Sequence, residues 1–137
     1  MTEDDIAAFR ERMETVVYSL KIAPQVAENQ VIDRVALSFR KLLNFFAENT
    51  EMTQQILLSP PHARETQSLL SALIAGNLAF SQQNALFRDD ISATLMGQCF
   101  TGIIVQLACE PGDPALRHQN SQACAKLFCE GIWSGKL

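Results

Sequence analysis

The sequence predicts an all-α fold, a six-helix bundle formed by residues 1–137 as a single domain. Apolar residues recur at spacings of three and four along most of the chain, and no segment shows the strict alternation of a β-strand. Proline, asparagine and aspartate stand between these periodic segments, where helices begin and end. The predicted helices span about residues 3–22, 25–48, 51–58, 62–83, 91–109 and 114–133.

The first two predicted helices each carry one apolar stripe. Thr2 is a suitable N-cap for the first, and acidic residues follow it in the first turn, where the helix dipole favours negative charge. Pro24 marks the break after this helix. In the second helix apolar residues recur over 32–46, and most charged residues fall off that stripe. This is the clearest amphipathic pattern in the chain.

Turn residues separate the later helices. Ser-Pro-Pro at 59–61 ends the short third helix, and Asn84 is expected to end the fourth because asparagine tolerates the left-handed conformation. The expected N-caps are Thr50 for the third helix, Asp89 or Asp90 for the fifth, and Asp113, followed by Pro114 in the first position, for the sixth.

The fourth and fifth predicted helices carry almost no charge. No Lys, Arg, Asp or Glu occurs within 66–87 or within 91–109. A helix on the surface of a globular protein normally has charge on its outer face. Because so short a chain has little other material to cover both helices, we expect part of this surface to meet a second copy. The alternatives are hydrated polar strips and a membrane hairpin, which the glutamines and asparagines within both segments disfavour.

The expected homodimer joins the last two long helices of each chain in a four-helix contact around a two-fold axis. Neutral amides and hydroxyls on these helices could hydrogen-bond across it, and Gly97 and Gly102 would let another backbone approach. The predicted interface residues are Thr94, Gln98, Thr101, Gly102, Val105, Gln122, Ala125, Cys129 and Trp133. The side of the sixth helix expected to face the core carries Leu116, Ala123, Cys124, Leu127, Phe128 and Gly131.

The composition disfavours several classes of function. Apolar residues make up 47% of the chain and its formal net charge is -4, so neither disorder nor a nucleic-acid-binding domain is expected. The densest basic region, Arg34, Arg40 and Lys41, is interpreted as a solvated helix face. The acidic N-terminus does not resemble a secretory signal, so a cytoplasmic location is expected. No catalytic motif is visible, and neither an enzyme nor a cofactor is predicted.

The four cysteines, Cys99, Cys109, Cys124 and Cys129, lie in apolar helical surroundings. They are expected to be small buried side chains in a reducing compartment. A redox sensor or an inter-chain disulfide is the alternative, and it requires an accessible thiol with a low pKa. None of the cysteines forms a C-x-x-C pair and both histidines stand alone, so no metal is predicted.

Three segments resemble the C-terminal domain of TetR-family bacterial transcriptional regulators. FRKLLNFFAENTEM at 39–52 is similar to a helix and turn of that family, and 68–102 is similar to its central helix pair, with Asn84, Phe87, Arg88 and Asp90 at the turn. AKLFCEGIW at 125–133 resembles its closing helix. Family members begin with a three-helix DNA-binding head, which this chain lacks. The chain alone is therefore not expected to bind DNA, whether it is a fragment or a headless relative.

The resemblance implies a small-molecule cavity between the first, second, fourth and fifth helices of a probable repressor. Asn77 follows Leu73 and Ile74 on an apolar face and is the candidate polar contact, unless it bonds to a neighbouring helix. The candidate ligand-binding residues are Phe9, Met13, Phe39, Phe46, Leu73, Asn77, Phe80, Met96 and Phe100. The expected effector is small, uncharged and mostly apolar. The alternative function is a dimeric helical scaffold without a small-molecule site.

Overall fold

A computed structural model describes residues 1–135 of the chain, and this part contains six α-helices and no strand. The elements in chain order are α1 (Glu3–Ser19), the 3₁₀ turn η1 (Glu28–Gln30), α2 (Val31–Glu48), α3 (Thr50–Ile56), α4 (Ala63–Gln83), α5 (Ala93–Ala108) and α6 (Pro114–Glu130). The all-α prediction is confirmed. None of the helices in this part is long and apolar enough to cross a membrane.

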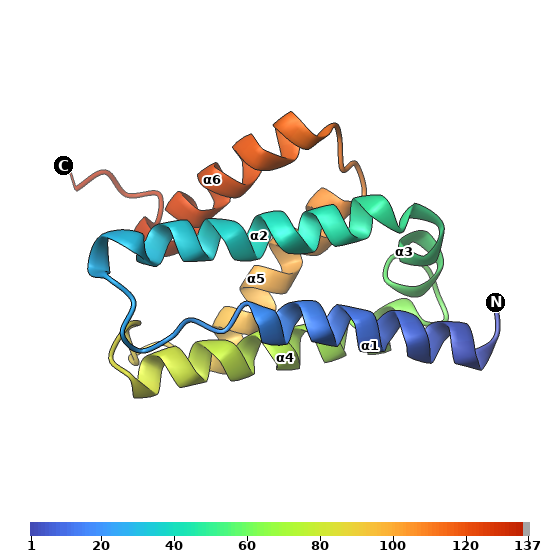
Figure 1. The fold of residues 1–137 in the computed structure, drawn as a ribbon, viewed down its shortest axis with the longest axis horizontal. Helices are drawn as coiled ribbons and strands as arrows, with labels where there is room; N and C mark the ends of the chain where they lie inside the picture. Colours follow the sequence, from blue (N-terminus) through green and yellow to red (C-terminus); the bar gives the residue numbers. More distant parts are fainter. Residues whose placement is uncertain (136–137) are drawn as a thin grey trace.

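The helices form two layers joined by α5. α1 and α4 lie side by side and run in the same direction, and α2 runs opposite to them in the second layer (Figure 1). α5 packs mainly on α4 and then crosses towards α2, whereas α6 packs mainly on α2. The short α3 closes the end of the bundle that lies nearer the N-terminus (Figure 1).

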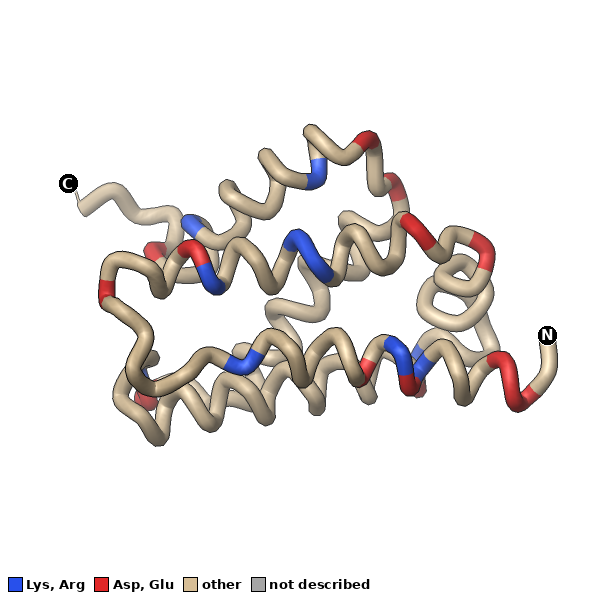
Figure 2. The backbone as a smooth tube through the Cα atoms, in the orientation of Figure 1, with Lys and Arg blue, Asp and Glu red and all other residues tan. Residues whose placement is uncertain are grey.

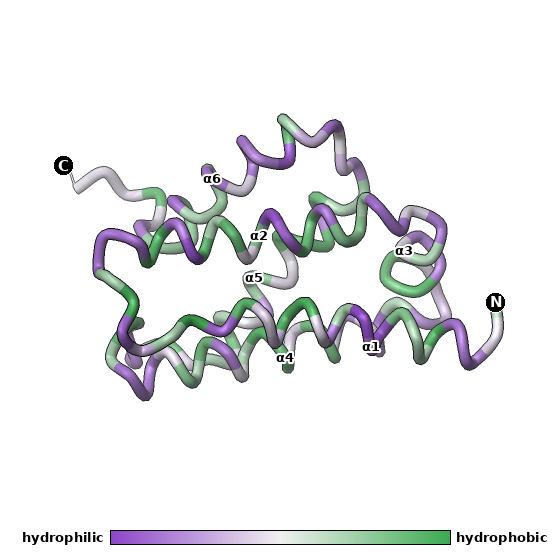
Figure 3. Tube along the Cα trace, viewed as in Figure 1, coloured by the Kyte–Doolittle hydropathy of each residue, from purple (hydrophilic) through white to green (hydrophobic). Residues whose placement is uncertain are grey.

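The core lies between the two layers and is built by the apolar stripes of α1 and α2, whose hydropathy appears in Figure 3. Phe9 and Met13 on α1 and Phe39 on α2 have no exposed surface. Phe39 stacks on Phe100 of α5 with 4.0 Å between ring centroids, and Phe100 meets Phe128 of α6 edge-on at 5.4 Å. These three rings therefore join three helices through one aromatic contact.

Two predicted helix starts are confirmed. Thr2 Oγ1 accepts a hydrogen bond from the Asp5 backbone N–H at 3.1 Å, and the Asp5 carboxylate accepts one from the Thr2 N–H at 3.0 Å. This reciprocal capping box begins α1, and its backbone hydrogen bond from Thr2 lowers the pKa of Asp5. At α6, Asp113 accepts from the Leu116 N–H at 2.8 Å and Pro114 occupies the first turn.

Two other predicted starts are wrong. α2 begins at Val31 instead of about residue 25, because the segment before it has no apolar stripe to pack and forms only η1. α5 is capped by Ser92, which accepts from the Leu95 N–H at 3.1 Å. Asp90 does not cap the helix because its carboxylate accepts two hydrogen bonds from Arg88, at 2.5 and 2.6 Å.

Three further details of the helix ends differ from the predictions. α3 begins at Thr50 itself, whose hydroxyl donates to the Ala47 carbonyl at 2.8 Å instead of capping. Asn84 does end α4, but the left-handed residue is Ala85, with φ 59°. α6 ends at Glu130 because Gly131 adopts φ 76°, which breaks the helical path before Trp133.

The contact between α4 and α5 is closest at Gly97. A Cβ atom at this position would lie 2.8 Å from the Ser71 carbonyl oxygen and 3.0 Å from the Ala75 Cβ. Gly97→Ala is therefore expected to lower the free energy of unfolding by about 1–3 kcal/mol. Gly76→Ala on α4 meets open space and is expected to raise it by about 0.5–1 kcal/mol. Urea unfolding of both variants measures the difference, and equal changes would contradict the close contact.

Candidate functional site

A small cavity lies between α1, α2, α4 and α5, the four helices between which the resemblance places a ligand. Its volume is about 40 Å³, and its walls are mostly apolar. The polar side chains that line it are Ser38, Asn77 and Ser81. Small-molecule sites usually measure about 300–1,000 Å³. This cavity therefore holds no more than a few waters or a very small ligand unless the helices move apart.

Asn77 ties α4 to the end of α1 beside this cavity. Its amide nitrogen donates to the Val17 carbonyl oxygen at 2.8 Å. Val17 lies in the last turn of α1 and also lines the cavity. The bond to a neighbouring helix, which the sequence left as the alternative for Asn77, is thus present, and the side chain borders the cavity as well.

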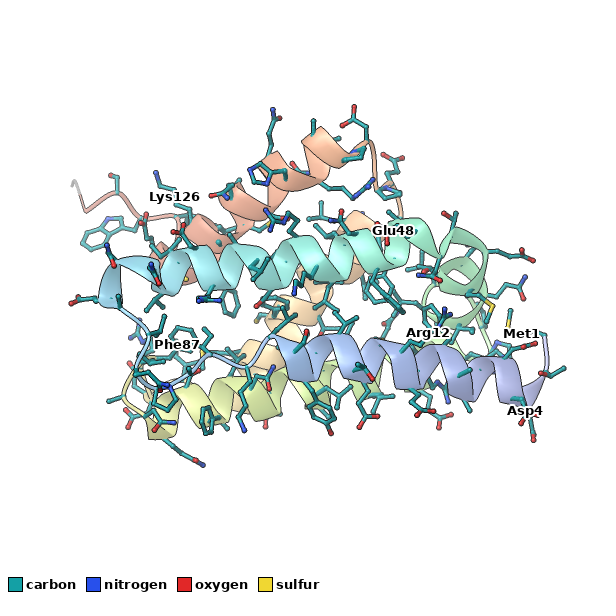
Figure 4. The ribbon with its side chains drawn as sticks, in the orientation of Figure 1. Met1, Asp4, Arg12, Glu48, Phe87 and Lys126 are labelled. Carbon is teal, nitrogen blue, oxygen red and sulfur yellow. The ribbon has the colours of Figure 1, made fainter. Side chains whose placement is uncertain are left out.

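The structure brings two of the nine candidate ligand contacts to the cavity, Asn77 and Phe100. The others lie elsewhere: Phe9, Met13, Phe39 and Phe46 fill the core, and Leu73, Phe80 and Met96 are half-buried outside the cavity lining. The Lys21 ammonium lies over the Phe80 ring, 3.9 Å from its centroid. Met96 lines a separate surface groove together with Phe87. Phe87 lies at the end of the bundle far from the N-terminus (Figure 4).

Sequence reasoning missed the two serines of the cavity. Ser38 lies between Val35 and Leu42 on the apolar stripe of α2, and Ser81 lies one turn after Asn77 on α4. Asn77 was predicted because it is a neutral polar residue on an apolar helix face. Both serines show the same pattern and could have been predicted in the same way.

Five of the predicted interface residues line a groove of about 610 Å³ between α4 and α5. They are Thr94, Gln98, Thr101, Gly102 and Val105. Across the groove α4 presents small side chains, among them Ser68 and Ala72. The Thr101 hydroxyl oxygen is buried without a hydrogen-bond partner among residues 1–135. Figure 2 shows that α5 bears no charge along its length.

The predicted α6 residues lie apart from this groove because α6 packs on α2. Gln122, Cys129 and Trp133 are exposed. Ala125 has no exposed surface within the chain, so its predicted contact with a second chain is wrong. The predicted core side of α6 is correct only for Cys124 and Phe128, which pack against the core. Leu116 and Leu127 are 43% and 44% exposed, and Ala123 and Gly131 are exposed as well. The residues that α6 buries are Arg117, Ser121 and Ala125.

Large exposed apolar side chains occur on α5, on α6 and just after α6. They are Leu95, Leu116, Leu127, Ile132 and Trp133, and we call them the exposed apolar set. Ile132 and Trp133 are 90% and 70% exposed. Exposed apolar side chains of this size are typical of surfaces that bind another protein when they form a contiguous patch.

Three cysteines are exposed, contrary to the prediction that all four are buried: Cys99, Cys109 and Cys129, with Cys124 half-buried. Partial loss of hydration raises the pKa of the Cys124 thiol, and partial loss of hydration together with the negative charge of Glu130 raises the pKa of the Cys129 thiol. A raised pKa lowers the thiolate fraction, which makes these two thiols less reactive. Within residues 1–135 no group of three or more His, Cys, Asp or Glu side chains could hold a metal ion.

Comparison with known proteins assigns this chain to no group: no family model, no curated protein and no solved structure matches it.

Proposed function

We propose that the chain is the effector-binding and dimerisation domain of a TetR-like bacterial transcriptional regulator, a repressor that acts in the cytoplasm. The proposal starts from the resemblance drawn from the sequence, and the six α-helices supply the all-α domain that it requires. The observation that carries the proposal is the hydrogen bond from Asn77 to Val17, which borders the cavity between α1, α2, α4 and α5.

This hydrogen bond offers a direct way to couple ligand binding to a helix movement. A ligand with an acceptor oxygen competes with the Val17 carbonyl for the Asn77 amide. Because the cavity has only about 40 Å³, an organic effector must also separate α1 from α4 to fit. The ligand therefore favours a conformation in which α1 is displaced, and the population shifts towards it. The effector is small and mostly apolar, with one hydrogen-bond acceptor.

Displacement of α1 would affect DNA binding by moving the DNA-binding head that precedes this domain in the family. In the proposed homodimer the two heads contact half-sites whose spacing is set by the geometry of the double helix. A change in the position of α1 in each chain alters the separation of the heads and lowers operator affinity. This chain provides the sensor and the dimer contact, and DNA is bound only through the head.

The exposed apolar set supports the dimer contact on α5 and α6. Leu95→Lys on α5 and Leu127→Lys on α6 place a charge within the proposed contact, and each is expected to raise the dissociation constant of the dimer at least tenfold. Tyr18→Lys on α1 is the control, because Tyr18 is 61% exposed and lies outside the contact. Sedimentation equilibrium of the three variants measures this. A monomeric parent protein, or equal weakening by all three substitutions, would contradict the proposed contact.

Native mass spectrometry of the purified protein tests the sensor function. We expect a dimer that carries additional mass and loses it on denaturation, and the mass identifies the effector. Asn77→Ala is expected to reduce the fraction of dimer that retains this mass. If the variant retains the same mass as fully as the parent protein, Asn77 does not contact the effector.

The second candidate function is a dimeric helical scaffold without a small-molecule site. The small cavity favours it, because a volume of about 40 Å³ leaves little room for an organic ligand. A bare dimer whose melting temperature is unchanged across a library of small apolar compounds would support the scaffold and exclude the sensor.

A further inference from the structure

A second groove, between α2 and α6, gathers basic side chains that the proposed function does not use. Its volume is about 340 Å³, near the lower end of the range for small-molecule sites. Arg34 and Arg40 enter it from α2, and His118 enters it from α6. The sequence alone suggested a solvated helix face for the arginines, because it could not show that α6 packs opposite them.

Arg40 and His118 meet across the groove without a compensating acid. Arg40 Nη1 lies 3.3 Å from His118 Nδ1. The guanidinium can only donate, so this contact is a hydrogen bond when Nδ1 is the unprotonated nitrogen of the ring. No acidic side chain takes part in it, and the other N–H groups of Arg40 are donors that a ligand can use.

No carboxylate pairs with either arginine. Among residues 1–135 the ion pairs with an N···O distance of 4.0 Å or less are Arg10 with Glu65 and Arg88 with Asp90. Asp33 is the one acidic side chain in the groove lining. Arg34 and Arg40 have no ion-pair partner within residues 1–135, and both line this groove of a chain whose formal net charge is -4. This part of the surface thus differs in sign from the molecule as a whole.

The spacing of the arginines suits a ligand with several oxygens. Arg40 lies six positions after Arg34 on α2, so their Cα atoms are about 9 Å apart along the helix axis and about 120° apart around it. This spacing is wider than the i,i+4 distance at which residues on one helix pair directly. Long side chains from both positions can converge on one group between them. The side-chain amides of Gln30 and Gln122 add neutral donors at the same groove.

From this geometry we infer that the α2–α6 groove binds the phosphate or pyrophosphate group of a small ligand. Each guanidinium offers a planar pair of N–H donors to phosphate oxygens, and the two arginines approach from different positions along α2. A tetrahedral or doubled phosphate group can accept from both, whereas a single carboxylate has only two oxygens. This site is separate from the cavity at Asn77, and its test is independent of the proposed sensor function.

The two histidines of the chain make the test specific. His118 lies in the groove, and His62 lies at the start of α4, outside it. The full chain is titrated with sodium pyrophosphate at constant pH and ionic strength while the histidine ring resonances are followed by NMR. We expect a saturable shift at His118, with no comparable shift at His62. Equal shifts at both histidines, or none at His118, would overturn the inference.

Substitutions distinguish specific binding in the groove from general electrostatic attraction of the anion to positive charge. Arg40→Gln and Arg34→Gln are each expected to weaken pyrophosphate binding at least fivefold. Arg64→Gln is the matched control, because Arg64 is exposed on α4 outside the groove, and it is expected to change binding less than twofold. Arg40→Lys retains the charge but loses the planar donor pair, and an intermediate loss is expected. Equal affinities for the Arg40→Gln and Arg64→Gln variants, or tighter binding of acetate than of pyrophosphate, would overturn the inference.

Discussion

Replacing Phe39 by alanine is expected to lower the free energy of unfolding by about 3–5 kcal/mol. Phe39 has no exposed surface, and its ring stacks on Phe100 while it lies edge-on to Phe128 at 6.2 Å. Removing the ring leaves a cavity where α2, α5 and α6 meet. Because these helices hold their positions through other contacts as well, they cannot close the cavity completely.

Phe80→Ala is the control for this prediction. Phe80 is only half-buried, and its ring supports Lys21 at the surface. Phe80→Ala is expected to lower the free energy of unfolding by about 1 kcal/mol, since less apolar area returns to water than in Phe39→Ala. Urea unfolding followed by circular dichroism measures both variants, at one protein concentration because dimerisation would contribute to stability. A loss below about 1 kcal/mol for Phe39→Ala would contradict its place at the centre of the core.

The faces of α1 and α2 could be predicted from the sequence because each helix has one apolar stripe and charge on the other side. Phe9, Met13 and Phe39 lie on these stripes and are completely buried. A helix with a single apolar stripe can remove that stripe from water only by turning it towards the core. Ile32, at the first turn of α2, is the exception, since α2 begins only one residue before it and leaves it 38% exposed.

The faces of α5 and α6 could not be predicted in the same way. Both helices have apolar residues on more than one side, so periodicity does not say which side a neighbour covers. On α6 the structure buries Arg117 and leaves its neighbour Leu116 exposed. An arginine can be buried only where hydrogen-bond acceptors surround its guanidinium, and these acceptors come together only in the folded chain. For the same reason Ala125 was predicted at the dimer interface, although it is completely buried within the chain.

The candidate cavity shows a different limit. The sequence identified a polar residue on an apolar face, and Asn77 does border the cavity. Phe100 also lines it, but Phe9, Phe39 and Phe46 fill the core instead, because the identity of a side chain does not show whether its neighbours leave space beside it. Cavity volume depends on how well whole helices fit together, and no local pattern records that fit.

Arg117 carries the second large effect that we expect. Its Nε donates to the Asn44 side-chain oxygen at 2.7 Å, and its Nη1 donates to the Gly112 carbonyl at 2.5 Å. These bonds fasten the first turn of α6 both to α2 and to the turn that precedes α6. The guanidinium has no carboxylate partner within residues 1–135, so the two neutral acceptors provide its hydrogen bonds in a largely buried position.

Arg117→Ala is expected to lower the free energy of unfolding by about 2–4 kcal/mol, since it removes two charge-assisted hydrogen bonds and the packing of the long side chain. It also leaves the half-buried Asn44 oxygen without this donor. Arg117→Met keeps most of the side-chain volume and removes the cost of burying a charge, so a loss of only about 1 kcal/mol is expected. Urea unfolding of both variants distinguishes the two contributions. If Met is as destabilising as Ala, the hydrogen bonds alone stabilise this corner, and if neither variant loses stability, α6 is held to α2 by its apolar contacts.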